Sequence, residues 1–179
     1  MLLFFPWETS YNQREIVGGN GMRKFNWRPY AFWILLTEAV GGLSGLLARE
    51  GIERYTELAV KPALTPPAWV FPLAWVLLYA LMGAAAARVW LLPRGGERLR
   101  SLALYLLQLG VNFFWSIIFF SWRLYGGALL WLAGLWALVL WLLLRLRRQD
   151  PPAAKLLIPY QLWLTFALYL NLGVFLLNG

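Results

Sequence analysis

The sequence predicts an all-α membrane protein, a bundle of five transmembrane helices. Of its 179 residues, 61% are hydrophobic and only 13% are charged, whereas soluble domains run about 45–50% apolar and about a quarter charged. Five apolar runs each approach the roughly 20 residues that a helix needs to cross a bilayer. Twelve Trp and eight Tyr fit this class, because their rings favour the membrane interface.

The predicted spans cover about 30–47, 68–90, 101–122, 125–145 and 155–178, after an N-terminal arm at 1–28. The arm lacks the basic, apolar and small-residue regions of a signal peptide. Twelve Lys and Arg flank the spans on the N-terminal side, against four on the other side. Because cytoplasmic loops are enriched in Lys and Arg, we expect a multi-pass protein of a bacterial cell membrane with a cytoplasmic arm.

The first span contains an ionisable residue, Glu38, followed by Gly41, Gly42 and Gly45 on nearly one helical face. Small residues let helices approach closely in lipid, so Glu38 can be a hydrogen-bonded packing residue. An intramembrane carboxyl group also indicates a functional site by default. Both interpretations stay open.

The connection at 48–67 is long and polar, and connections of this length are uncommon unless they act as lids or binding loops. It ends with Pro62, Pro66 and Pro67, which we expect to form the hinge of a lid over an intramembrane pocket. Proline is tolerated at a helix start, so Pro66 and Pro67 are expected to begin the second span. That span places Trp75 and Tyr79 on one face.

The third span has a polar and aromatic stripe, in which Gln108, Asn112, Trp115 and Phe119 recur at helical spacing. Amides in hydrocarbon need hydrogen-bond partners. They can join helices to one another or line a ligand cavity. The fourth span offers no chemistry, and the fifth presents one face that holds Tyr160, Trp163, Ala167 and Leu170, with Asn171 beside it.

Several function classes are disfavoured by what the sequence lacks. It has no Cys and no His, and no hydrolase, nucleotide-binding or zinc-protease motif, so we expect no catalytic residue and no metal site. The cations lie in short loops, where they set orientation, so no nucleic-acid partner is expected. An aromatic interior dotted with amides suits a large, flat, mainly apolar ligand.

Four motifs resemble the translocator protein family, also called tryptophan-rich sensory proteins. They are KPxxxPPxWVFPxxW at 61–75, LYxxMGxAAxxVW at 78–90, QLxxNxxWxxxFF at 108–120 and PPAAxLLxPYxxWxxFAxxLN at 151–171. The resemblance implies a five-helix bundle, often a homodimer, with one pocket under the first loop. It also implies a porphyrin ligand, such as protoporphyrin IX or another tetrapyrrole of the haem pathway, with no required cofactor.

The resemblance assigns roles by motif position. It implies that Trp75 and Trp163 lie against the porphyrin, that Asn112 and Trp115 line the pocket, that Ala167 and Leu170 form its wall, and that Pro66 and Pro67 form the hinge. Together with Tyr79 and Phe119 from the helical faces, these are the predicted ligand-binding residues.

One departure affects the expected function. The family usually has a tryptophan two residues before the Pro-Pro pair, and this chain has Leu64. Three functions therefore stay open. The protein senses, sequesters or moves porphyrins; it degrades them in light through tryptophan radicals; or it is an oligomeric membrane interaction protein.

Overall fold

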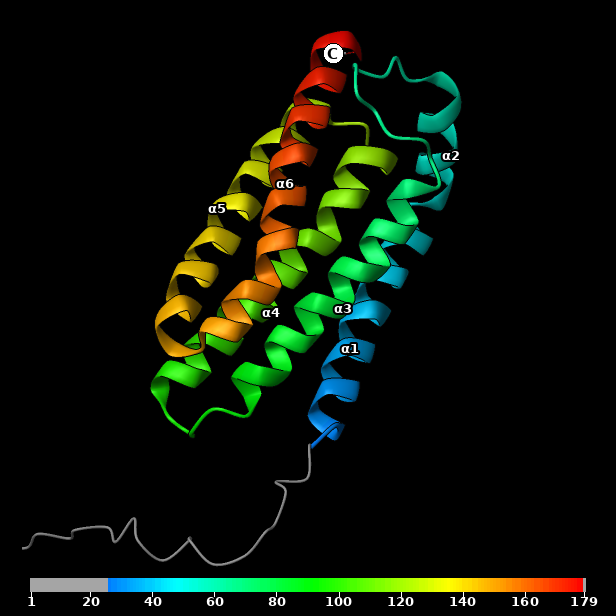
Figure 1. The fold of residues 1–179 in the computed structure, drawn as a ribbon. Coiled ribbons are helices and arrows are strands. Elements are labelled where there is room, and N and C mark those ends of the chain that lie inside the picture. The colour runs from blue at the N-terminus through cyan, green and yellow to red at the C-terminus, as the bar shows by residue number, and fades with distance from the viewer. Residues whose placement is uncertain (1–25, 179) are drawn as a thin grey trace, which may run out of the picture.

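Five long helices run the length of the molecule in alternating directions, and a short sixth helix lies at one end (Figure 1). The structure is a computed structural model, and it describes residues 26–178. The helices are α1 (Arg28–Leu47), α2 (Arg49–Leu58), α3 (Val70–Trp90), α4 (Gly96–Ser116) with its π-helical continuation η1 (Ile117–Ser121), α5 (Tyr125–Gln149) and α6 (Pro151–Asn178).

The fold class is confirmed. Five of these helices, α1, α3, α4 with η1, α5 and α6, are long and apolar enough to cross a membrane, and the described residues contain no strand. Large apolar side chains such as Phe32, Leu35, Leu130 and Leu162 are more than 60% exposed. A surface of this kind is suited to contact with lipid tails.

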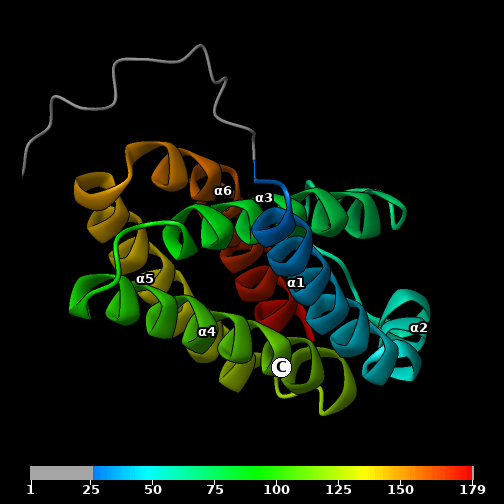
Figure 2. The same ribbon diagram turned by 90° about the horizontal axis from the view of Figure 1, so that it is seen from below.

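The helices close into a ring in the order α1, α3, α6, α5, α4, and α3 also packs on α4 (Figure 2). Gly83 allows α3 to approach α1 closely, because a Cβ there would lie 2.5 Å from the Ile34 Cα. Gly41 packs on the ring of Tyr79 in the same interface, whereas Gly42 and Gly45 meet no atom within 4 Å. The core inside the ring contains Met82, Leu132, Tyr160 and Leu164, each at most 1% exposed.

The two ends of the bundle differ. The lid end, at the top of Figure 1, holds α2, the extended lid at 59–69, the turn at 122–124 and the last turns of α6. The turn end, at the bottom, holds the tight turn at 91–95 and the single residue Asp150 between α5 and α6.

The predicted loop at 48–67 is partly helical, because the ten residues Arg49–Leu58, five of them charged, form α2. Exposed ion pairs between residues one helical turn apart, Arg49 with Glu53 and Glu50 with Arg54, support this helix. Gly51 brings α2 against the Phe120 backbone, where a Cβ would lie 2.5 Å from the carbonyl carbon. The lid proper is therefore the shorter segment 59–69.

Other boundaries also differ from the prediction. Pro66 and Pro67 precede α3 instead of beginning it, because the Val70 N–H donates to the Pro67 carbonyl (3.0 Å) in a turn before the first helical residue. The helix α4 begins at Gly96, before the predicted 101, and α6 begins at Pro151, before the predicted 155. Asp150 explains the latter, since its Oδ1 accepts the Ala153 N–H (3.2 Å) as an N-cap.

Candidate ligand-binding site

An inner aromatic cluster joins α3 to α6 and contains two of the predicted tryptophans. Trp75 stacks on Tyr79, one helical turn away, with ring centroids 5.2 Å apart. Trp75 also contacts Tyr160 and Trp163 of α6 edge-on, each at 6.3 Å. Phe71 adds a further edge contact to Trp163 at 6.0 Å. Trp75 and Trp163 are only half-buried, so both rings reach the border of the interior.

A hydrogen bond connects this inner aromatic cluster to α4. Asn112 Nδ2 donates to the Tyr79 hydroxyl at 3.3 Å, and both side chains are buried. One turn further, Trp115 stacks on Phe119 at 5.3 Å. Phe119 in turn contacts Tyr55 of α2 (5.5 Å) and Tyr125 of α5 (5.2 Å). We call Tyr55, Trp115, Phe119, Phe120 and Tyr125 the second aromatic cluster.

Six of the eight predicted ligand-binding residues therefore lie in these two linked clusters. The other two, Ala167 and Leu170, follow Trp163 on the same face of α6, with Ala167 buried and Leu170 half-buried. Glu38 lies half-buried in α1 and makes no hydrogen bond or ion pair within residues 26–178. The eight predicted ligand-binding residues thus lie on three elements, α3, α4 with its continuation η1, and α6.

Several buried polar atoms inside the ring have no hydrogen-bond partner in the described part of the chain. They belong to α4 and α6, and they are both amide atoms of Gln108, the Trp115 indole nitrogen, the Tyr160 hydroxyl, the Gln161 amide oxygen and both amide atoms of Asn171. A buried polar group without a partner costs about 1–3 kcal/mol. These groups can offer donors and acceptors to a guest.

The lid is fastened to α6 near its C-terminal end. Asn178 accepts the Val60 N–H and donates to the Val60 carbonyl, both at 2.9 Å. Tyr169 donates to the Ala63 carbonyl at 2.8 Å. Pro62 packs so closely on Gly173 that a Cβ on this glycine would lie 2.5 Å from the proline Cβ. The lid therefore lies closed over the end of the bundle.

The predicted hinge prolines lie at different places in this lid. Pro62 is the docking residue, and its carbonyl accepts the Thr65 hydroxyl at 2.7 Å. Pro66 and Pro67 lie on the α3 side, after Leu64, whose φ of 65° is in the left-handed region. A non-glycine residue there is uncommon and strained. The sharpest bend of the lid is therefore at Leu64.

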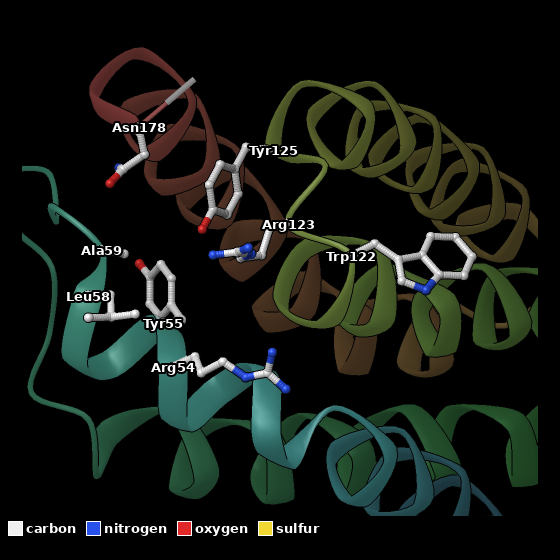
Figure 3. Close-up of a pocket in the computed structure, with 8 residues that line it drawn as sticks. All are labelled: Arg54, Tyr55, Leu58, Ala59, Trp122, Arg123, Tyr125 and Asn178. Carbon is white, nitrogen blue, oxygen red and sulfur yellow. The ribbon is translucent and has the colours of Figure 1, made fainter.

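The lid end also has a hollow that the sequence did not predict, shown in Figure 3. This outer cavity has a volume of about 420 Å³ and is lined by Arg54, Tyr55, Leu58, Ala59, Trp122, Arg123, Tyr125 and Asn178. Burial raises the pKa of the Tyr55 hydroxyl above its usual range, and the nearby Tyr125 raises it further. The Tyr55 hydroxyl therefore stays protonated at neutral pH and can donate a hydrogen bond.

Sequence reasoning missed the outer cavity because its residues come from three separated segments, each with an ordinary polar appearance. One signal was available, since Arg123 is the single cation in the turn between the third and fourth spans. Within residues 26–178, no group of three or more Cys, His, Asp or Glu could hold a metal ion.

The fold and interior define a class: a multi-pass membrane protein with an aromatic interior under a loop that closes one end of a five-helix ring. Comparison with known proteins narrows this class. Residues 33–177 match the TspO/MBR family, and the chain belongs to that family. The resemblance drawn from the four motifs is thereby confirmed.

Relatives come from distant organisms. The chain is 34% identical to the tryptophan-rich protein TspO of Chlorobaculum tepidum over 151 residues, which cover 83% of this chain and 94% of the relative. It is 36% identical to the translocator protein of Bos taurus over 149 residues, covering 81% and 87%. A tryptophan-rich sensory protein of Cereibacter sphaeroides is 39% identical over 118 residues, covering 66% and 73%.

Proposed function

We propose that this protein binds porphyrins, such as protoporphyrin IX and other tetrapyrroles of the haem pathway, and related flat hydrophobic ligands, and serves in their sensing or trafficking. The ligand would lie inside the ring, stacked on Trp75 and Trp163 and under the lid. The printed names of the relatives, sensory protein and translocator protein, fit such a role.

The observation that carries the proposal is the set of unpartnered polar atoms beside the aromatic clusters. A merely structural interior would pair the amides of Gln108 and Asn171 with neighbouring helices, as Asn112 is paired with Tyr79. Aromatic rings next to unpaired donors and acceptors match a guest that has a flat apolar body and polar substituents. The stacked rings of Trp75 and Tyr79, with centroids 5.2 Å apart, supply aromatic surface for such a guest.

The proposal is tested by titrating the protein, in neutral lipid nanodiscs, with protoporphyrin IX and following the absorbance band of the porphyrin. This readout is independent of how many tryptophans a variant keeps. The double variant Trp75→Phe with Trp163→Phe should bind roughly tenfold more weakly, because each stacking contact contributes about 0.5–1.5 kcal/mol beyond area burial. Trp141→Phe, at an exposed tryptophan of α5, is the matched control, and equal affinity in all three proteins would refute the proposal.

Asn171→Leu gives a second, sharper test. If the Asn171 amide is a ligand-binding group, its replacement should raise the free energy of unfolding without ligand by about 1–2 kcal/mol, because an unpaired buried polar group is removed. The same change should weaken porphyrin binding. Loss of stability together with unchanged binding would instead identify Asn171 as a packing residue.

Light-dependent degradation is separated from binding by illuminating the complex. A new bilin-like absorbance would indicate degradation, and its absence would leave binding alone. Because Leu64 stands where the family usually has a tryptophan and is 79% exposed on the lid, we expect no product from the natural protein. Leu64→Trp is the variant in which a product would first appear.

The proposal includes a homodimer in the membrane. A Cβ added at Gly42 or Gly45 of α1 would meet no atom of residues 26–178 within 4 Å, and small residues of this kind let a second helix approach closely. Gly45→Leu should shift the protein to monomer in cross-linking experiments, while Gly134→Leu, at a glycine of α5 that is equally open, should not. If the natural protein were already monomeric, this part of the proposal would be overturned.

A further inference from the structure

We propose that the outer cavity is a second binding site, distinct from the porphyrin pocket, for an oxyanion group, carboxylate or phosphate, at the end of an apolar chain. The cavity opens at the lid end between α2, the turn at 122–124 and the end of α6 (Figure 3). Its ligand would be an amphiphile of the adjoining membrane surface. This inference does not rest on the porphyrin proposal.

Charge is the first reason. The cavity is lined by two arginines and by no acidic residue. Arg123 makes no ion pair or hydrogen bond with the described residues, and Arg54 bonds only to Glu50, at 3.1 Å across an exposed pair. Exposed pairs of this kind contribute little, so both guanidinium groups are available. Arginine offers a planar set of donors that matches carboxylate and phosphate.

Hydrogen-bond donors are the second reason. In Figure 3 the hydroxyls of Tyr55 and Tyr125 and the guanidinium of Arg123 gather on one side of the cavity, while the Trp122 indole points away from them. The N-terminal end of α5 begins at Tyr125 without a side-chain cap. Its first N–H groups therefore add positive partial charge to the same region.

Backbone strain is the third reason, and it is independent of charge. Arg123 has a φ of 55°, in the left-handed region that long side chains avoid. It follows η1, a π-helical turn at Ile117–Ser121, and such turns recur at functional sites. A glycine or asparagine would form this turn at lower cost. The strain places a guanidinium group in the cavity instead.

The size and the apolar part of the wall define the rest of the ligand. A volume of about 420 Å³ lies within the range of small-molecule sites, about 300–1,000 Å³. Leu58 and Ala59 supply apolar wall on the lid side. Tyr55 continues from the cavity to Phe119 and Phe120 at 5.5 and 5.3 Å. The occupant therefore has an oxyanion at one end and an alkyl chain at the other.

The chain has no natural cysteine, which allows a local reporter. Leu58→Cys, labelled with an environment-sensitive fluorophore, is titrated in phosphatidylcholine nanodiscs with dodecanoate, methyl dodecanoate and dodecyl phosphate. Dodecanoate should change the fluorescence and its methyl ester should not, because the ester has no negative charge. A response to dodecyl phosphate as well would identify lipid headgroups as a source of the oxyanion, and a response to dodecanoate alone would identify carboxylic acids.

Arg123→Asn is the decisive variant, since asparagine tolerates the left-handed backbone and the change removes charge without adding strain. It should weaken dodecanoate binding roughly tenfold, as expected for the loss of a charge-assisted contact. Arg54→Gln should weaken it as well and serves as the second variant if Arg123→Asn misfolds. Arg147→Gln, at the other end of the molecule, is the control for general membrane charge and should change nothing.

Two results would overturn the inference: equal binding of the acid and its ester, or unchanged binding in Arg123→Asn and Arg54→Gln. The porphyrin proposal would survive either result, because it depends on the inner cluster. Conversely, the double variant Trp75→Phe with Trp163→Phe should bind dodecanoate normally.

Discussion

The turn end and the lid end of this bundle are held together by different kinds of interaction. At the turn end, ion pairs with one largely buried partner, Asp150 in one and Arg145 in the other, join helices that are far apart in sequence. Arg88 of α3 donates to Asp150 at 3.0 and 3.2 Å, and Arg145 of α5 donates to Glu97 of α4 at 2.6 Å. Gln149 and Ser101 complete the second group with a hydrogen bond of 2.8 Å.

At the lid end, the ion pairs are local and exposed, and the contacts between elements are hydrogen bonds to backbone and ring packing. Both non-glycine residues with positive φ in the described chain, Leu64 and Arg123, lie at this end. The comparison indicates that the turn end is rigid and that the lid end is adaptable. Ligand-binding regions tend to lie in the less stable parts of a fold, so the ligand sites are expected at the lid end.

The largest predicted difference concerns the side of the membrane on which each end lies. With the N-terminus cytoplasmic, Leu64→Cys on the lid should react with an impermeant thiol reagent in intact cells, and Arg94→Cys in the tight turn should not. Permeabilised cells should label both, which controls for burial. The reverse labelling pattern would show that the N-terminus is outside. It would not affect the difference in interactions between the turn end and the lid end.

The next largest effect is on stability at the turn end. Asp150→Ala should lower the free energy of unfolding by roughly 2–3 kcal/mol, because Arg88 loses its buried partner and α6 loses its N-cap. Arg88 is partly exposed, so this estimate is at the low end for buried pairs. Glu50→Ala at the lid end should cost less than about 0.5 kcal/mol, as measured by denaturant titration in detergent micelles, and equal losses would contradict the comparison.

A smaller and more local effect is expected at the lid. Gly173→Ala places a Cβ 2.5 Å from the Pro62 ring, so the lid must shift outward. Hydrogen exchange of residues 59–69 should become roughly tenfold faster, which corresponds to a local loss of about 1.4 kcal/mol. Exchange in the turn at 91–95 should not change. Gly134→Ala, on an open face of α5, should leave both segments unaltered.

The smallest expected effect is a gain in stability at the lid. Leu64→Gly relieves the left-handed strain at the bend of the lid, and should stabilise the protein by about 0.5–1 kcal/mol. The midpoint of thermal unfolding is the measurement, with Leu58→Gly as a control that should lose stability instead, since Leu58 ends a helix. A loss in both variants would mean that the lid conformation is not strained.

The sequence predicted the spans well because apolar runs of membrane length have few alternative structures. Helical spacing put Trp75 and Tyr79 on one face, and the resemblance added Asn112 to the expected pocket; in the structure Tyr79 contacts both of the other residues. The sequence did not predict α2, because the apolar face of this short charged segment, which holds Ile52 and Tyr55, covers only a few residues. This helix depends on its contacts with Phe119 and Phe120.

The starts of α4 and α6 were predicted too late for a related reason. Hydropathy detects the edge of the membrane, whereas these helices begin outside it. Glu97 lies in the first turn of α4 and is fixed by Arg145, a residue 48 positions away. Asp150 begins α6 while it also binds Arg88. Such pairings depend on the tertiary structure and leave no periodic pattern in the sequence.

One junction has a mechanical consequence. Asp150 alone separates α5, with 25 residues, from α6, with 28 residues, so the two form a hairpin whose far ends, Tyr125 and Asn178, lie at the lid end. At about 1.5 Å per residue, α6 is roughly 42 Å long, and a rotation of about 3° at Asp150 would move its tip by about 2 Å. A small tilt at this one residue is thus enough to move the lid end of α6 by more than the radius of a carbon atom.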